Sequence, residues 1–527
     1  MQEARRSFLL DAARLTAAAT TGAVFSAGAA GVEKSYPFSL GVASGSPLPH
    51  SVILWTRILP DPLDAASVSA IALTVRWEVA EDDAFRKVVA QGGAVASPEL
   101  AHSVHVDATG LRPERWYWYR FMLGDAVSPV GRTRTAPAAA TLPASLKLVV
   151  ASCQHWEFGH YAAHRHIAAA APDLVAFLGD YIYEWGPYQL RHPERAVRSN
   201  ESFTLAQYRA RYAQYKSDPH LQSAHHAAPW IVTWDDHEVA NDYAGDIDER
   251  LSPDFAARRA AAYQAFYEHM PLRLPAPQPG RFGSMRMYQR HDWGRLARFH
   301  VLDNRQYRSP LPCSKPGRGG SNVVLARACA ELRDPSRTML GSEQEAWLAQ
   351  GLSTSRAQWN ILAQQTPMAQ SSGVPVRSPE DGRFWTDGWD GYPVARRRLL
   401  DTLVNSGAKN PLVLAGDVHT FYASELRRDF SRPASKANPV LAAELCGTSI
   451  TSSSRPQART QENVERNPHI LYGRSDKRGY MLMEVTRQSA QARFMGLDDV
   501  HAAASGQGLL AAFEVNASSG RIEQTRR

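Results

Sequence analysis

LKLVVASCQ at residues 146–154 and DLVAFLGDYIYE at residues 173–184 form the stretch of sequence that decides the fold. Each contains a short apolar run, and the segment between them is rich in Ala and His, so the pattern predicts a strand, a crossover helix and a second strand. The first strand ends just before Cys153, and the second ends just before Asp180 and Tyr183. Ligands bind at the carboxyl ends of strands in open α/β sheets, because the loops converge there. A thiolate, a carboxylate and a phenolate at one edge predict a site for a trivalent or strongly Lewis-acidic metal ion.

The composition describes a globular protein of two to four domains. The chain has 527 residues, of which 44% are hydrophobic, and this supplies ample core. The net charge of +7 comes mostly from scattered Arg and not from a basic run. We therefore expect no nucleic-acid-specific binding. The positive charge fits a protein that meets small anionic substrates.

The N-terminus has the pattern of an export signal. Arg5 and Arg6 precede a weakly apolar, Ala/Thr-rich run, which resembles a Tat signal segment at 1–30. The run is too short and too polar to remain as a bilayer anchor. We expect the Tat translocon as a transient partner and a periplasmic or secreted mature protein without an integral membrane segment. An ordinary amphipathic N-terminal helix is the alternative.

The four cysteines fall into three groups. Cys313 and Cys329 could form a disulfide in an oxidising, exported compartment. Cys446 lies in the apolar run VLAAELCG and is most simply a buried small hydrophobic residue. Cys153 differs from the others because it follows a strand end among polar residues.

The chain before residue 137 has a different pattern from the chain after residue 145. Short alternating strands are expected at 51–58, 72–80, 101–109 and 115–123, and they predict an immunoglobulin- or fibronectin-like β-sandwich at 36–137. An Ala/Pro-rich linker follows. From residue 146 onward apolar strands alternate with helical segments, which is typical of an α/β fold.

Two further strands also end at metal-ligand side chains. The run at 230–234 is followed by Asp235, Asp236 and His237, and the run at 412–415 is followed by Asp417 and His419. One such acidic residue is usually a cap or a turn residue. Four strand ends of this kind in one apparent sheet predict a functional site. A shared carboxylate beside a second carboxylate and a histidine is the usual arrangement of a two-metal phosphoester site.

Seven motifs occur in a characteristic order: ASCQ (151–154), LGDYIYE (178–184), TWDDHEV (233–239), LDNRQYRS (302–309), WDGYP (389–393), LAGDVH (414–419) and GTSITS (447–452). In this order they resemble the PhoD-type alkaline phosphatases and phosphodiesterases of the calcineurin-like metallophosphoesterase superfamily. The resemblance covers roughly residues 36–490 and includes the signal and the β-rich N-terminal region. It implies a four-layer αββα metallophosphoesterase sandwich at 145–490, preceded by the β-sandwich and followed by a C-terminal extension at 491–527.

The resemblance also implies a mixed metal centre of Fe³⁺ and one or two Ca²⁺ ions. Cys153, Asp180 and Tyr183 would hold Fe³⁺, with Asp180 bridging to calcium. A thiolate and a phenolate suit a hard ferric ion that gives charge-transfer colour.

The remaining ligands implied by the resemblance are Asp236, Asp417 and His419. Asp236 stands where related enzymes usually have Asn, and Asp417 replaces the first histidine of a His-x-His pair. Both departures add carboxylate oxygen, which Ca²⁺ prefers. Asn241 is an alternative ligand.

The function implied is that of an exported, metal-dependent phosphoesterase. It would hydrolyse phosphomonoesters, phosphodiesters or both through a metal-activated oxygen nucleophile. The substrate would be a small phosphoester or a phospholipid. His237 could donate a proton to the departing alkoxide, or it could be a histidine outside the reacting shell. Arg305 could bind phosphate oxygens, or it could form a structural salt bridge.

Three other functions stay open at this point. A phospholipase D-like phosphodiesterase would use the same site. A non-catalytic surface protein would bind calcium without turnover, although such a site has no need of a thiolate and a phenolate. A cysteine hydrolase would use Cys153 as its nucleophile.

Overall fold

The structure is a computed structural model that describes residues 36–188, 192–278, 280–378, 380–517 and 519–526. The expected signal segment at 1–30 lies outside the described residues. Among the residues that are described, no helix combines the length and the apolar character that crossing a membrane requires.

Two large sheets form the centre of the fold. The ten-stranded sheet has the order β24 (Ile522–Arg526), β23 (Gln507–Asn516), β22 (Ser489–Leu497), β21 (Gly479–Thr486), β9 (Ser145–Ala151), β10 (Leu174–Phe177), β11 (Trp230–Val232), β1 (Val42–Leu48), β2 (Ser51–Arg57) and β5 (Ser103–Thr109). The seven-stranded sheet has the order β12 (Gln289–Trp293), β13 (Ala297–Val301), β15 (Trp359–Ala363), β17 (Pro411–Ala415), β19 (Ala442–Cys446), β18 (Phe421–Leu426) and β20 (Ile470–Arg474).

The strand, helix and strand expected at 146–184 are present. β9 and β10 pair in parallel, with Leu148 opposite Leu174, and α2 (Ala162–Ala170) connects them. β11 continues the parallel part of the sheet on the other side of β10. The carboxyl ends of β9, β10 and β11 therefore lie along one edge of the sheet.

Alternation along β9 explains why the two sheets stack face to face. Leu148 and Val150 point into the core between the two sheets, where they meet residues such as Ile361 of β15. Val149 and Ala151 point to the opposite face and pack against helices. The four-layer αββα arrangement is therefore confirmed.

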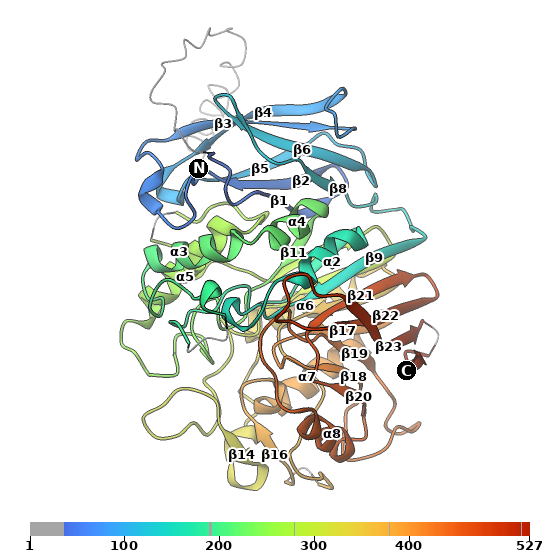
Figure 1. The fold of residues 1–527 in the computed structure, drawn as a ribbon. Coiled ribbons are helices and arrows are strands. Elements are labelled where there is room, and N and C mark those ends of the chain that lie inside the picture. The colour runs from blue at the N-terminus through green and yellow to red at the C-terminus, as the bar shows by residue number, and fades with distance from the viewer. Residues whose placement is uncertain (1–35, 189–191, 279, 379, 518, 527) are drawn as a thin grey trace, which may run out of the picture. The chain divides into compact units, whose positions relative to one another are not determined.

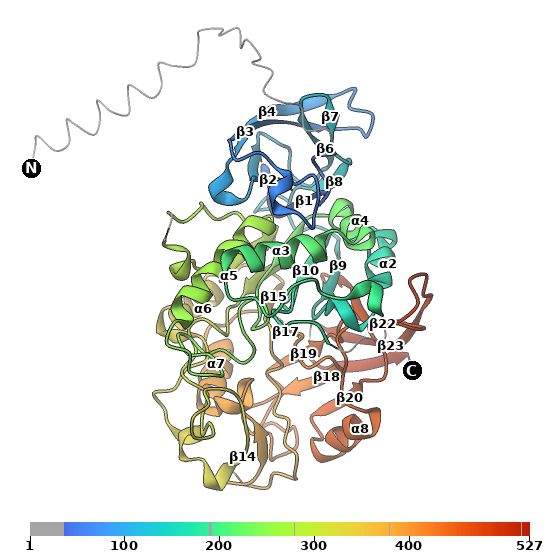
Figure 2. The same ribbon diagram turned by 60° about the vertical axis from the view of Figure 1, so that its left-hand side comes forward.

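Helices cover both outer faces (Figure 1 and Figure 2). The ten-stranded sheet is covered by α2, α3 (Leu205–Lys216), α4 (Pro219–Ala227) and α5 (Phe255–His269), whereas the seven-stranded sheet is covered by α6 (Gly341–Ser353) and α7 (Pro393–Asn405). The last helix, α8 (Gln457–Arg466), contacts β20. Between the helical layers lie mainly aliphatic and aromatic side chains, so packing stabilises the four layers.

The N-terminal strands form a sandwich that shares a sheet with the rest of the chain. Its outer sheet comprises β4 (Val88–Ala96), β3 (Leu73–Ala80), β6 (Trp116–Leu123), β7 (Ala126–Val127) and β8 (Gly131–Arg134). This sheet packs on β1, β2 and β5 through a core that includes Val75, Tyr119 and Leu54. The expected strands at 51–58, 72–80, 101–109 and 115–123 correspond to β2, β3, β5 and β6. β1 also pairs with β11, with Gly45 opposite Trp230.

The C-terminal strands also belong to the ten-stranded sheet. The expected boundary at residue 490 falls inside β22, and β23 and β24 continue the same sheet in antiparallel order. The division into domains stays a prediction. A separate two-stranded ribbon is made of β14 (Val323–Leu325) and β16 (Arg383–Trp385). Cys313 and Cys329 form a disulfide, and Cys446 is a buried free thiol.

Candidate metal centre

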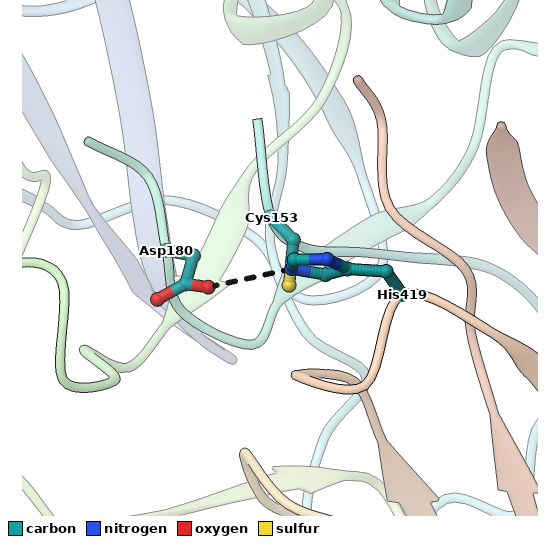
Figure 3. Close-up of side chains that lie close together, drawn as sticks. All are labelled: Cys153, Asp180 and His419. Atoms are coloured by element: carbon teal, nitrogen blue, oxygen red, sulfur yellow. Dashed lines mark ion pairs between the residues drawn. The ribbon is translucent and has the colours of Figure 1, made fainter. Parts of the chain in front are cut away.

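Loops from distant parts of the chain bring Cys153, Asp180 and His419 together. Cys153 follows β9, Asp180 follows β10 and His419 follows β17 of the other sheet. Their ligand atoms all lie within 4.8 Å of one another. Figure 3 shows the Cys153 sulfur and the His419 ring close to each other and facing the Asp180 carboxylate. Nε2 of His419 lies 3.9 Å from Oδ2 of Asp180.

The backbone at these positions is in an uncommon conformation. The φ angles are 61° at Cys153, 55° at Asp180, 63° at Asp417 and 54° at His419. Residues other than glycine rarely adopt this left-handed region, and they concentrate at sites where geometry serves function. Gly179 is also left-handed, and a Cβ there would lie 2.4 Å from Cβ of Asp235. The loops after β10 and β11 therefore pack directly against each other.

Three further groups of ligand atoms adjoin the first. They contain Asp180, Asp236 and His237, then Asp235, Asp236 and Asp417, and finally Asp236, Asp242 and Asp387. Asp180 belongs to two of these groups and Asp236 to three, so the four groups form one continuous row of possible ligands. A row with shared carboxylates has room for two neighbouring cations.

The Tyr183 hydroxyl lies at the centre of the first group. It donates a hydrogen bond to Oδ2 of Asp180 at 2.9 Å and receives one from Ser452 at 2.7 Å. Its oxygen is 3.2 Å from Nε2 of His419. Burial raises the pKa of Tyr183 well above its usual value, and the charge of Asp180 raises it further. Ionising this phenol in place therefore requires a compensating cation.

A backbone contact at Nδ1 fixes the orientation of the His419 ring. Nδ1 lies 2.6 Å from the carbonyl oxygen of Ser453, which can only accept a hydrogen bond. Nδ1 therefore carries the proton, and Nε2 presents a lone pair toward Asp180 and Tyr183. A histidine held in this way is prepared to be a metal ligand.

Arg305 is fully buried and is surrounded by aspartates. Nη1 donates to both oxygens of Asp387 at 2.6 and 2.8 Å, Nη2 donates to Asp417 at 3.0 Å, and Nε donates to Asp235. Nη2 also lies 3.6 Å from Asp236. These contacts occupy every N–H-bearing nitrogen of the guanidinium group, so in this structure Arg305 has the geometry of a structural ion pair.

His237 is bound to a carboxylate on the same side of the site. Its Nδ1 lies 2.8 Å from Oε2 of Glu184, and its ring contacts Tyr183 in a tilted arrangement and Trp185 edge to face. Burial by itself would lower the pKa of His237, but Glu184 and Asp236 raise it well above the usual range. The contact with Glu184 therefore favours the charged form of the imidazole.

Comparison with known proteins identifies the group to which this chain is related. The family model described as PhoD-like phosphatase matches residues 148–494, and the model of the N-terminal domain of the same phosphatases matches residues 25–137. The chain belongs to the PhoD-like phosphatase family. Alkaline phosphatase D of Bacillus subtilis (strain 168) is 44% identical over 505 residues, covering 93% of this chain and 84% of that protein. A solved structure described as the structure of PhoD is 42% identical, with a TM-score of 0.87 over 94% of this chain and 93% of that one.

Membership in the PhoD-like family confirms the resemblance found in the motifs. The chain is a hydrolase that acts on phosphoesters, and the β-rich N-terminal region belongs to the family pattern. The four-layer fold agrees with the similar solved structure. The roles of single residues are not part of these comparisons and stay predictions.

Several residues of this PhoD-like site do not stand out in the sequence. Glu238 accepts backbone hydrogen bonds from Asp180, Tyr181 and Asp235, and so it joins the loops after β10 and β11. Asp387 holds Arg305 from a loop far away in sequence. The position of Glu238 within the motif TWDDHEV, directly after His237, is the sequence feature that could have indicated it. Which groups its carboxylate contacts is shown only by the fold.

Asn241, the alternative ligand, contacts two glutamates that belong to none of the four groups. Its Nδ2 donates to Glu249 at 3.3 Å, and its backbone N–H donates to Glu184 at 2.7 Å. In the described part of the chain, no group of possible metal ligands of the kind above contains its neighbour Glu249. We keep Asp236 as the proposed ligand, because its carboxylate belongs to three of the four groups.

Proposed function

We propose that this chain is an exported phosphoesterase whose site holds Fe³⁺ and one or two Ca²⁺ ions. The observation that carries the proposal is the row of ligand atoms linked through Asp180 and Asp236. Cys153, Asp180, Tyr183 and His419 offer a thiolate, a carboxylate, a phenolate and an imidazole, which suit iron. Asp236 and Asp417 add carboxylate oxygens, which suit calcium.

The charge balance supports metal binding at this site. Six aspartates, at positions 180, 235, 236, 242, 387 and 417, gather here, and Arg305, Arg308 and His237 supply the positive charge beside them. Burial raises the pKa of Asp235 and Asp417 well above the usual value, although Arg305 acts in the opposite direction. Oδ1 of Asp180 and Oδ2 of Asp235 are buried, and neither has a hydrogen-bond partner among the described residues. Unpartnered buried carboxylate oxygens are costly unless a cation binds them.

When bound, such a pair of cations neutralises the phosphate charge and activates an oxygen nucleophile. The chain's own residues then complete the reaction. We assign His237 the role of proton donor to the departing oxygen, since Glu184 keeps its imidazole charged and oriented. We assign Arg305 a positioning role, because it holds Asp235 and Asp417 at their places.

The space beside the site supports a substrate with an organic group on the phosphate. A pocket of about 430 Å³ is lined by Asp417 and also by Arg383, Arg455 and the exposed Trp385. Two arginines and an aromatic ring can hold a second anionic or planar part of a substrate. This observation favours phosphodiesters as a second candidate substrate, including the phospholipids of a phospholipase D-like activity.

Export is supported by the signal-like segment at 1–30 and by the disulfide between Cys313 and Cys329, since disulfides persist in oxidising compartments. We therefore propose a periplasmic or secreted location.

The test uses the full-length chain loaded with Fe³⁺ and Ca²⁺. We expect hydrolysis of p-nitrophenyl phosphate, bis-p-nitrophenyl phosphate or both, and we expect a chelator to abolish it. The ratio of the two rates separates monoesterase from diesterase activity, and a phosphatidylcholine substrate tests the phospholipase alternative. Inactivity on every one of these substrates would favour a non-catalytic calcium-binding protein. Activity that survives chelation and is lost on alkylation would favour a cysteine hydrolase.

A further inference from the structure

A second group of metal-ligand side chains lies outside the catalytic row. It consists of His160, His192 and Glu194, whose ligand atoms all lie within 4.8 Å of one another. His160 lies just before α2, whereas His192 and Glu194 belong to the loop between β10 and α3. Neither the family match nor the proposed reaction uses these residues.

The distances fit a single small cation. Oε1 of Glu194 lies 3.2 Å from Nδ1 of His192 and 3.7 Å from Nε2 of His160. Ligands bound to a tetrahedral zinc ion at about 2.0–2.1 Å lie about 3.4 Å from one another. Both distances from the carboxylate oxygen to the imidazole nitrogens are therefore close to the spacing that such an ion requires.

A third histidine, His501, contacts His192 on the side away from Glu194. Nε2 of His192 lies 2.9 Å from Nδ1 of His501, on the side of the ring opposite Glu194. Histidines that bind metals through one nitrogen usually have a hydrogen-bond partner at the other, which fixes the tautomer and the ring orientation. With a metal at Nδ1, the proton of His192 must lie on Nε2, where it can be donated to His501.

A simple ion pair explains the arrangement less well. The Glu194 side chain is 59% exposed, and a solvated pair of this kind stabilises little. A pair would also require one protonated imidazole, whereas here two imidazoles face the same carboxylate oxygen. Convergence of both rings on one point is what a shared cation requires.

We propose that His160, His192 and Glu194 bind a divalent transition-metal ion of the zinc type, with His501 orienting His192. Imidazole and carboxylate ligands suit such ions, and three protein ligands leave one position for water. The ion would join the start of α2 to the loop between β10 and α3, and through His501 also to the loop that follows β22.

The loop held by this ion contacts the catalytic region at its other end. It contains Tyr188, whose backbone N–H donates to Glu157 at 2.9 Å. The same loop contains Trp185, whose ring centroid lies 4.3 Å from that of His237. The ion would therefore fix His192 and Glu194 in the loop whose earlier part, at Trp185, lies against the proposed proton donor. This inference does not depend on the proposed function.

The test measures zinc binding to the full-length enzyme after its catalytic metals are loaded. We expect one additional Zn²⁺ per chain by calorimetry and by elemental analysis after gel filtration. His160→Ala and Glu194→Gln should lose this ion, and His501→Ala should bind it about 10–100-fold more weakly. His50→Ala removes an exposed histidine of the N-terminal region and should bind zinc as the unchanged protein does.

Hydrogen exchange provides the second readout. Added Zn²⁺ should slow exchange of the backbone amides at 192–200 in the unchanged protein and in His50→Ala, but not in Glu194→Gln. Glu194 is largely exposed, so its variant should fold normally. Equal zinc stoichiometry in Glu194→Gln and the unchanged protein would overturn the proposal, as would zinc binding that leaves exchange at 192–200 unaltered.

Discussion

Glu184 and His237 form a buried ion pair in which Oε2 of Glu184 lies 2.8 Å from Nδ1 of His237. The other oxygen of Glu184 accepts the backbone N–H of Asn241 at 2.7 Å. The carboxylate therefore fixes both the charge and the direction of the imidazole ring. This relationship makes the role of His237 testable without changing His237 itself.

Glu184→Gln should reduce kcat by about 10–100-fold, the usual effect of removing a partner that orients a functional group. The loss should be larger for an alkyl phosphate than for p-nitrophenyl phosphate, because a poor leaving group needs a proton more. Steady-state kinetics on the two substrates measure this difference. An equal loss on both would argue against His237 as the proton donor.

Cys153→Ala should remove iron and reduce turnover, because it deletes the thiolate of the first ligand group. The chain offers a matched control in Cys446→Ala, which changes the other buried free cysteine outside that group. Elemental analysis of both purified variants measures the iron content. Iron retained in Cys153→Ala at the level of the Cys446→Ala control would contradict the ligand assignment.

Tyr183→Phe should abolish the visible charge-transfer band of the iron-loaded protein. The phenolate is the group expected to transfer charge to Fe³⁺, and the substitution removes only the hydroxyl that contacts Asp180 and Ser452. Absorption spectroscopy of the metal-loaded variant measures the band. An unchanged colour would mean that Tyr183 does not bind iron.

Arg305→Met should destabilise the metal-free protein by about 3–5 kcal/mol, because it leaves buried carboxylates without their counter-charge. Added metal ions should restore part of this stability, since they supply positive charge to Asp235 and Asp417. Urea unfolding with and without EDTA measures both effects. A direct substrate contact would give the opposite result, a raised KM with unchanged stability.

Lys216 should make the free energy of unfolding depend on pH in the alkaline range. Burial lowers the pKa of this amine from 10.5 to about 7 in the folded protein. Between these two values the unfolded chain binds more protons, so stability should rise as the pH increases from 7 to 10. Below pH 7 the Lys216 amine is protonated in both the folded and the unfolded protein, so the full free-energy cost of burying its charge remains.

Lys216→Met should therefore stabilise the protein by up to about 4 kcal/mol at pH 7. It should also flatten the increase in the free energy of unfolding between pH 7 and pH 10. The ammonium lies 4.2 Å from the centroid of the Trp55 ring, a contact that offsets part of the burial cost. Lys436→Met, at an exposed position, serves as the control. Urea unfolding across this pH range measures the effect, and identical pH profiles of the two variants would refute the prediction.

The family and the layered fold follow from local sequence patterns. The apolar runs before Cys153, Asp180 and Asp417 predicted strands, and the structure has β9, β10 and β17 there. The alternation that makes these strands is a property of neighbouring residues, so it can be recognised without knowledge of the rest of the chain. The motif order was equally informative, since it indicated the phosphatase family before any geometry was known.

The sequence by itself determined which chemical groups follow the strand ends. It also determined the family to which the chain belongs. Only the tertiary structure decided that Arg305 is held by Asp235, Asp387 and Asp417, that Glu238 joins two loops, and that His192 faces Glu194 and His501. The physical reason is that a strand and its ending depend on residues next to each other. The partners of a buried charge depend instead on which loops, far apart in the sequence, the packing of two sheets brings within hydrogen-bond distance.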